Sequence, residues 1–126
     1  MKLLLDTHVL LWGIAGDPRL TPTIERMIRS EDNDSFVSIA SLWEIAIKMR
    51  RGKLVAPDDL PVLLDSDPDF SILDATIDHV WRVRTLPLIH ADPFDRLLVA
   101  QAMAEGMSLV THDRRMADYG GAVILV

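Results

Sequence analysis

The sequence predicts an α/β fold, a three-layer α/β/α sandwich around a central, mainly parallel sheet. Two observations support this prediction. Short apolar runs alternate along the chain with longer segments of helical periodicity. Most of these runs, such as residues 3–5 and 109–110, are continuously apolar, which is typical of strands covered by helices on both faces.

Length and composition limit the class of protein further. A chain of 126 residues predicts a single domain over residues 1–126, and a hydrophobic content of 49% excludes a disordered chain. The absence of cysteine removes disulfides and thiolate metal sites. Neither a membrane-spanning run nor a leader peptide is visible, so we expect a cytoplasmic protein without membrane contact.

The acidic balance argues against a protein that holds nucleic acid through its overall charge. Thirteen lysines and arginines oppose 19 aspartates and glutamates, which gives a net charge of −6. This acidity could be concentrated at a cation site or could form a surface for a basic partner protein. Composition leaves both possibilities open.

Helix boundaries in the first half of the chain follow from capping patterns. Thr21 and Pro22 suit the cap and first position of a helix, and Ser41 with Glu44 matches a capping box. Gly52 follows a basic helix end. The expected elements are a strand at 2–5, helices at 8–15 and 22–29, a strand at 35–38 and a helix from 41 to about 51.

The second half contains the segment with the clearest helix start. Asp92 and Pro93 form a strong N-terminal signal, and the body of this helix is apolar nearly all round, so we expect it to be buried. Gly106 ends it. The expected elements are a short helix at 59–64, a strand at 70–73, helices at 76–84 and 93–103, a strand at 108–111, a short helix at 114–119 and a strand at 122–126.

Five carboxylates occupy positions that a parallel sheet brings together. Asp6 ends the first strand, Asp113 follows the strand at 108–111, and Glu44, Asp92 and Asp95 lie near helix starts. Functional sites gather at the carboxyl ends of parallel strands. Clustered carboxylates repel one another unless a cation intervenes, and oxygen ligands without cysteine or paired histidine suit Mg²⁺ or Mn²⁺. Such a site suits metal-assisted hydrolysis of phosphodiesters.

Each acid also has a purely structural interpretation. Asp92 is foremost a helix cap, Asp95 could complement the helix dipole, and Glu44 could close the capping box. Asp113 could cap the short helix that follows it. Asp6 can serve as a cap only if a helix begins at once with Thr7.

Four segments together resemble the PIN-domain ribonucleases, and most closely the VapC-type toxins of bacterial toxin–antitoxin pairs. The resemblance covers essentially the whole chain in order, although each segment alone is weakly specific. The segments are LLLDTH at 3–8, SLWEIAIK at 41–48, DPFDRLLVAQA at 92–102 and LVTHD at 109–113.

The resemblance implies a Mg²⁺-dependent endoribonuclease that a cognate antitoxin holds inactive, and we expect a homodimer. It places an acidic quartet at Asp6, Glu44, Asp95 and Asp113. Asp6 and Asp95 are the expected direct metal ligands. The residues expected to support the site are Thr7, Ser38, Asp92 and Thr111. The alternative function is a catalytically silent PIN-fold module that binds an antitoxin-like partner.

The remaining polar and aromatic candidates have open assignments. Lys48, Arg50 and Arg51 form either a solvated helix end or a contact for the RNA backbone. The three tryptophans, at 12, 43 and 81, are interpreted as core or interface residues first and as base-stacking surfaces second. The histidines are interpreted as surface or hydrogen-bonded residues, and His90 and His112 lie close enough to the acids in sequence to touch substrate.

Overall fold

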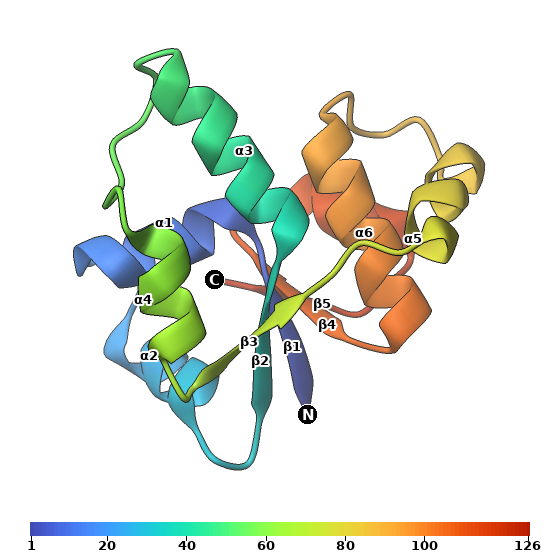
Figure 1. The fold of residues 1–126 in the computed structure, drawn as a ribbon. Helices are drawn as coiled ribbons and strands as arrows, with labels where there is room; N and C mark the ends of the chain where they lie inside the picture. The colour runs from blue at the N-terminus through green and yellow to red at the C-terminus, as the bar shows by residue number, and fades with distance from the viewer.

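A computed structural model describes all 126 residues and contains one five-stranded sheet (Figure 1). Every pair of neighbouring strands is parallel, and the strand order is β3-β2-β1-β4-β5. The strands are β1 (Lys2–Leu5), β2 (Asp34–Ser38), β3 (Phe70–Leu73), β4 (Ser108–Thr111) and β5 (Val123–Leu125). The predicted α/β fold with a parallel sheet is confirmed.

Helices connect these strands. They are α1 (Thr7–Ala15), α2 (Pro22–Arg29), α3 (Ile39–Arg50), α4 (Leu60–Ser66), α5 (Ile77–Arg82) and α6 (Pro93–Glu105), with two 3₁₀ helices, η1 (Val83–Thr85) and η2 (Arg114–Tyr119). The helix expected at 76–84 is therefore α5 continued by η1, and the short helix at 114–119 is a 3₁₀ helix. Gly106 ends α6 in the left-handed conformation, as the sequence predicted.

Alternating residues of β1 face two separate cores, which creates the three layers. Leu3 and Leu5 pack in a cluster that includes side chains of α1, α2 and α4. Leu4 points the other way and packs in a cluster with residues of α6 and η2. Successive strand side chains point to opposite faces, so a strand that is apolar at every position requires helices on both sides. Figure 1 shows these two helical layers flanking the sheet.

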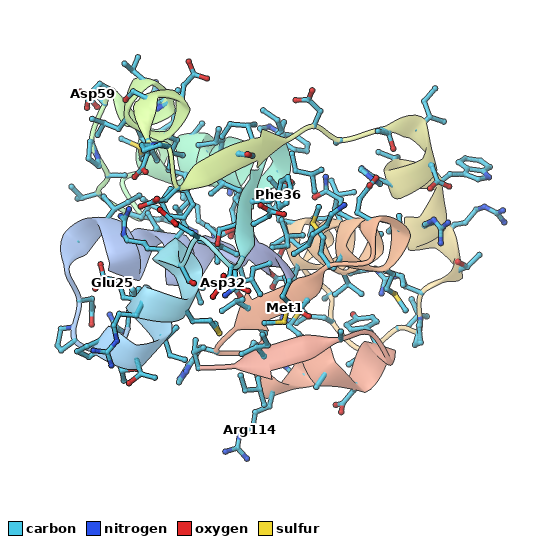
Figure 2. The ribbon with its side chains drawn as sticks, turned by 90° about the horizontal axis from the view of Figure 1, so that it is seen from below. Met1, Glu25, Asp32, Phe36, Asp59 and Arg114 are labelled. Atoms are coloured by element: carbon cyan, nitrogen blue, oxygen red, sulfur yellow. The ribbon has the colours of Figure 1, made fainter.

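Successive strands are added first on one side of β1 and then on the other, so the strand order reverses between β1 and β4. The chain proceeds from β1 outward to β2 and β3, and then crosses through α5 and α6 to β4 on the other side of β1. Loops leave such a pair of strands in opposite directions, so ligands of parallel α/β proteins bind outside the carboxyl ends at this switch point. At the opposite edge of the sheet the amino group of Met1 donates to the carbonyl oxygen of Asp32 at 3.2 Å. Figure 2 labels both residues.

The predicted start of α3 is wrong, because the helix begins at Ile39 and its cap lies three residues before the predicted one. Ser38, not Ser41, is the cap, because its Oγ accepts the backbone N–H of Ala40 at 3.0 Å. Ser41 and Glu44 are consequently both inside the helix and buried, and they form no capping box. The capping pattern misled because Ser38 offers an equivalent hydroxyl at the end of β2.

The burial of α6 differs from expectation as well. Five consecutive residues, Leu98–Ala102, are buried, but Met103 is 42% exposed, so the helix is not enclosed all round. Of the tryptophans, Trp12 is a core residue, whereas Trp43 and Trp81 are exposed, which leaves the interface and base-stacking interpretations for these two. No helix is both long enough and apolar enough to cross a membrane.

Candidate acidic site

Asp6 is fixed at the end of β1 by bonds to both of its carboxylate oxygens. Oδ1 accepts the backbone N–H groups of His8 at 2.8 Å and Val9 at 3.2 Å, so Asp6 caps α1, which begins at Thr7. Oδ2 accepts the hydroxyl of Thr111 at 2.6 Å. Because a carboxylate oxygen has about two acceptor positions, Oδ2 retains capacity for a further ligand. Helix capping and ligand binding are therefore compatible at Asp6.

Glu44 is a buried carboxylate oriented by Thr7. The hydroxyl of Thr7 donates to Glu44 Oε1 at 2.7 Å, and Lys48 forms an ion pair with Oε2 one helical turn away. This hydrogen bond with Glu44 raises the pKa of Lys48, so Lys48 stays charged. Ser41 lies 3.1 Å from the Thr7 hydroxyl. The start of α3 at Ile39 is what releases Glu44 from capping and points it toward α1.

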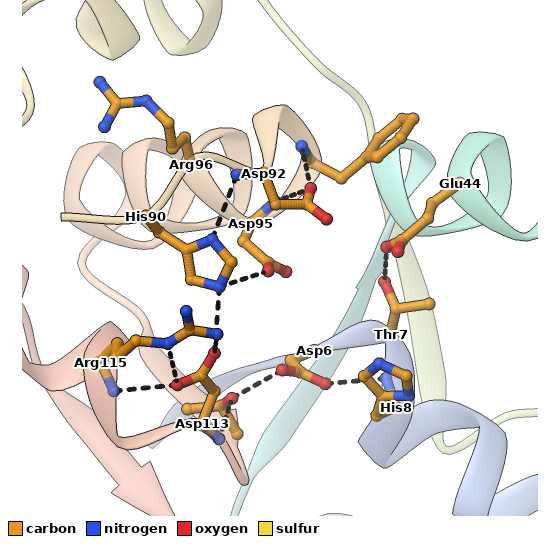
Figure 3. Close-up of polar contacts among 12 residues, drawn as sticks. Asp6, Thr7, His8, Glu44, His90, Asp92, Asp95, Arg96, Asp113 and Arg115 are labelled. Atoms are coloured by element: carbon orange, nitrogen blue, oxygen red, sulfur yellow. Dashed lines mark hydrogen bonds and ion pairs between the residues drawn. The ribbon is translucent and has the colours of Figure 1, made fainter. Parts of the chain in front are cut away.

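Asp92 and Asp95 have separate roles at the start of α6. Asp92 caps the helix, since its Oδ1 accepts the N–H groups of Phe94 at 2.8 Å and Asp95 at 3.2 Å, as its sequence context indicated. The Asp95 side chain projects toward Asp6 and Asp113 (Figure 3). Burial, followed by the negative charges of Asp92 and Asp6, raises the pKa of Asp95 to about 7.

Asp113 is partly buried, like Asp95, but it pairs with a cationic side chain. It caps η2 by accepting the N–H of Arg115 at 3.0 Å, and it pairs with the Arg115 guanidinium at 2.9 Å. This guanidinium lowers the pKa of Asp113 to about 2. The capping interpretation is confirmed, whereas Arg115 was not recognised from the sequence. No sequence signal singles it out, because surface arginines are common near helix starts.

His90 lies between two of the acids. Its Nε2 is 3.1 Å from Asp113 Oδ2 and 3.2 Å from Asp95 Oδ2, and single atoms of these three residues all lie within 4.8 Å of one another. The backbone N–H of His90 donates to the Tyr119 hydroxyl at 2.7 Å. The sequence placed His90 near the acids but gave no indication of these contacts.

Arg96 organises the segment that carries His90. Its guanidinium donates to the carbonyl oxygens of Pro87 at 2.7 Å, Val83 at 3.0 Å and Leu86 at 3.3 Å. In the sequence, Arg96 stands out only as one residue of the DPFDRLLVAQA segment at 92–102. A charged residue inside an otherwise apolar helical stretch is the signal that could have marked it, since such a residue needs partners.

The structure brings most of the predicted site residues together. Asp6, Glu44, Asp95 and Asp113 surround a common region at the switch point, and Thr7, Thr111 and Asp92 contact members of this group (Figure 3). Ser38 is the exception, because its hydroxyl bonds to Gln101 and caps α3. Of the basic cluster, Lys48 contacts Glu44, while Arg50 and Arg51 are exposed.

The donor set fits a hard divalent cation. Asp6, Glu44, Asp95 and Asp113 supply carboxylate oxygens, which Mg²⁺ and Mn²⁺ prefer. Burial first, and then the negative charges of Asp92 and Asp6, raise the pKa of Asp95, so its ionised form is disfavoured at this position. A cation bound among these groups would favour the ionised form of Asp95.

The fold and the site thus define a parallel α/β protein with a carboxylate cluster at the switch point of its sheet. A family model described as the PIN domain matches residues 3–122. The chain belongs to the PIN domain family, and the resemblance recognised in the sequence is confirmed.

Individual relatives agree with this assignment. Ribonuclease VapC22 of Mycobacterium tuberculosis (strain ATCC 25618 / H37Rv) is 31% identical, over 92% of this chain and 90% of the relative. The fold is similar to VapBC2 from Rickettsia felis bound to a promoter DNA fragment, with a TM-score of 0.75, 16% identity, and coverage of 99% and 98% of the two chains. DNA-bound VapBC from Salmonella typhimurium gives a TM-score of 0.68, 20% identity, and coverage of 98% and 97%.

Proposed function

We propose that this protein is a Mg²⁺-dependent endoribonuclease, with Mn²⁺ as an alternative ion, and the toxin component of a type II toxin–antitoxin pair. The observation that carries the proposal is the convergence of Asp6, Glu44, Asp95 and Asp113 at the switch point of a PIN domain. The similarity to a relative named as a ribonuclease supports this activity. The substrate class is RNA, hydrolysed at its phosphodiester bonds.

Each residue of the acidic site has its own proposed role. Asp6 and Asp95 are the proposed metal ligands, and a bound divalent cation would supply charge neutralisation at the scissile phosphate and activation of water. Thr111 holds the carboxylate of Asp6 through its 2.6 Å hydrogen bond. Thr7 holds Glu44 in the same manner at 2.7 Å. Glu44 and Asp113 would orient the attacking water or hold a second ion.

An RNA-cleavage assay with and without Mg²⁺ tests the proposal. Asp6→Asn and Asp95→Asn remove one carboxylate charge each at nearly constant shape, and we expect each to reduce cleavage by at least about 100-fold, the size typical of losing one electrostatic group at an active site. Asp65→Asn, on the exposed end of α4, is the matched control and should cut like wild type. Cleavage at the wild-type rate by both site variants would contradict the metal assignment.

If antitoxin-free wild type cuts no RNA across a broad substrate panel, the catalytically silent module replaces this proposal. A metal-binding measurement separates the two results. Calorimetric titration with Mn²⁺ reports whether the carboxylates hold an ion, irrespective of cleavage. Binding without cleavage would retain the metal site and reject the nuclease.

The antitoxin is proposed to bury a helix in an apolar groove between α1, α2 and α4. This groove has a volume of about 90 Å³ and is lined by side chains such as Leu10, Ile14, Leu20 and Leu63. Amphipathic helices bind grooves of this kind through their apolar face. A basic antitoxin side chain that reached the carboxylates would mimic the charge of the metal.

Single charges placed in this groove test the antitoxin site. Leu63 is 45% exposed and lines the groove, whereas its neighbour Val62 is 66% exposed and does not. We expect Leu63→Asp to weaken binding of the antitoxin encoded beside this gene by at least about tenfold, because it buries a charge in the interface. Val62→Asp should leave binding unchanged. Equal effects of the two variants would place the antitoxin elsewhere.

Contact with RNA is proposed for the basic end of α3. Lys48 borders the acids, and Arg50 and Arg51 extend from it on the exposed helix end. These cations would allow an acidic protein to hold an anionic substrate locally. Substitution of both arginines by glutamine should weaken RNA binding and make it less dependent on salt, measured by fluorescence anisotropy.

A homodimer is proposed through exposed apolar surface. Ile77, Val80 and Trp81 on α5 are between 55% and 89% exposed, which is unusual for large apolar side chains on one short helix. Sedimentation analysis of wild type and Trp81→Ser reports the oligomeric state. A monomeric wild type would contradict the proposal.

A further inference from the structure

His90 makes a set of contacts that fixes the position of its proton. The backbone N–H of Asp92 donates to His90 Nδ1 at 3.1 Å, so Nδ1 acts as an acceptor and carries no hydrogen. A neutral imidazole has one protonated nitrogen, which must then be Nε2. The arrangement therefore defines the Nε2–H tautomer.

This proton points at the acids. Nε2 lies 3.1 Å from Asp113 Oδ2, with which it forms a hydrogen bond, and 3.2 Å from Asp95 Oδ2 (Figure 3). The side chain is only 11% exposed. The two carboxylates come from different elements, Asp95 from α6 and Asp113 from the segment after β4. The Nε2–H of His90 is therefore a link between these two elements.

The same tautomer disfavours His90 as a metal ligand. A histidine that ligates a metal through Nε2 has lost the proton there, and its Nδ1–H usually donates to an acceptor. Here Nδ1 faces the N–H of Asp92, so a proton on Nδ1 would set two donors against each other. The three atoms of His90, Asp95 and Asp113 lie close enough together to suggest a ligand set, but the hydrogen-bond pattern opposes nitrogen ligation.

We propose that His90 is a positioning residue of the acidic site, whose Nε2–H holds Asp95 and Asp113 near each other and which does not bind the metal itself. The inference extends the proposed metal site. The surrounding contacts support it, because Tyr119 holds the His90 backbone and Arg96 holds the preceding carbonyl groups at 86 and 87. The segment from residue 86 to His90 is therefore held in place, and it fixes the position of the His90 ring next to the acids.

Two substitutions of His90, one that keeps a donor near Nε2 and one that removes it, test the proposed positioning role. Glutamine places an N–H donor near the position of Nε2, whereas alanine removes it. We expect His90→Ala to weaken Mn²⁺ binding by about tenfold, the lower end of the loss seen when a residue supporting a metal ligand is removed. His90→Gln should stay within about threefold of wild type, since the donor is kept. Calorimetric titration with Mn²⁺ measures both variants, and thermal unfolding confirms that they are folded.

Two spectroscopic measurements on the wild type test the tautomer and the ligand assignment. In ¹⁵N-labelled metal-free protein, long-range proton–nitrogen correlation should show a protonated Nε2 at His90. In Mn²⁺-loaded protein, pulsed electron paramagnetic resonance reports nitrogen atoms bound to the metal. Wild type and His90→Gln should give the same nitrogen coupling, because His90 does not bind the ion.

Several results would overturn the proposal: a protonated Nδ1, a nitrogen coupling that His90→Gln abolishes, wild-type Mn²⁺ affinity in His90→Ala, or equal losses in the Ala and Gln variants. None of these measurements requires RNA. A protein that behaves as expected for His90 but cleaves no RNA would reject the proposed nuclease alone. Absence of any Mn²⁺ binding by wild type would reject both.

Discussion

Two polar clusters border α6, and they are built on opposite principles. The acidic site at the start of the helix contains carboxylates from the residue after β1, from α3, from α6 and from the segment after β4. The second cluster lies along the later turns of α6 and contains Ser38, His79, Gln101 and Glu105. Both contain a histidine whose Nδ1 accepts a backbone N–H and whose Nε2 faces a carboxylate.

Balance of charge distinguishes the two clusters. In the second cluster, Ser38 bonds to the buried Gln101, and His79 Nε2 is 2.7 Å from Glu105, whose side chain is 39% exposed. This cluster adds only one carboxylate, and water reaches it. In the acidic site, Asp95 lies near Asp92, Asp6 and Glu44, and its pKa rises to about 7. The comparison teaches that the second cluster holds its single carboxylate without crowding, whereas the acidic site holds several carboxylates close together at a cost in stability. Under the proposed function, a bound cation would offset that cost.

The largest expected effect concerns this cost. Because the pKa of Asp95 is raised in the folded protein, the folded state binds more protons than the unfolded state between about pH 4 and 7, so stability falls as the pH rises through this range. Above pH 7 the full penalty remains. Asp95→Asn should therefore stabilise metal-free protein at pH 8, by up to about 4 kcal/mol, and add little at pH 4.

Urea unfolding in the presence of a chelator measures this difference. The same variant should lose cleavage activity, so stability and activity change in opposite directions. Equal stability of wild type and Asp95→Asn at pH 8 would show that the carboxylate carries no penalty.

A smaller effect, of opposite sign, is expected in the second cluster. His79 is 1% exposed and bonds to Thr76 through both its backbone and its ring. His79→Ala leaves a cavity and removes a partner of Gln101, which should cost about 3 kcal/mol of unfolding free energy. His90→Ala is the matched change in the acidic site and should cost less, about 1 kcal/mol, because Asp95 and Asp113, the partners of the ring, are partly exposed and can be rehydrated.

Unfolding curves of the two variants provide the comparison. RNA cleavage by His79→Ala should stay close to wild type at temperatures where it remains folded. Loss of cleavage in fully folded His79→Ala would mean that the second cluster also shapes the acidic site.

The smallest expected effects come from removing one hydroxyl group in each cluster, that of Ser38 or that of Thr111. Ser38→Ala removes the cap of α3 and the bond to Gln101, and it should cost about 1–2 kcal/mol of stability with unchanged Mn²⁺ affinity. Thr111→Val removes the donor to Asp6 and should instead weaken Mn²⁺ binding by about tenfold. If Ser38→Ala weakened Mn²⁺ binding more than Thr111→Val did, Ser38 and not Thr111 would be the hydroxyl that supports the metal site. Urea unfolding and calorimetric titration of both variants distinguish these outcomes.

Much of the fold was readable from the sequence because its signals are local. Apolar runs marked each strand, Asp92 and Pro93 marked the start of α6, and Gly106 marked its end. A capping pattern depends on residues two or three apart, so it is visible without tertiary information. The start of α3 was the failure, because two serines, Ser38 and Ser41, offered competing caps and only packing at the end of β2 selected the first.

By itself the sequence determined a parallel α/β fold and a set of acids at the carboxyl edge of its sheet, because parallel strands bring their carboxyl ends to one edge. The tertiary structure decided which partners those acids have. Thr111 and Asp6 are 105 residues apart, and Thr7 and Glu44 are 37 apart, so their hydrogen bonds exist only once the strands have paired. His90 joined the site for the same reason: Tyr119 and Arg96, invisible as partners in the sequence, hold it against Asp95 and Asp113.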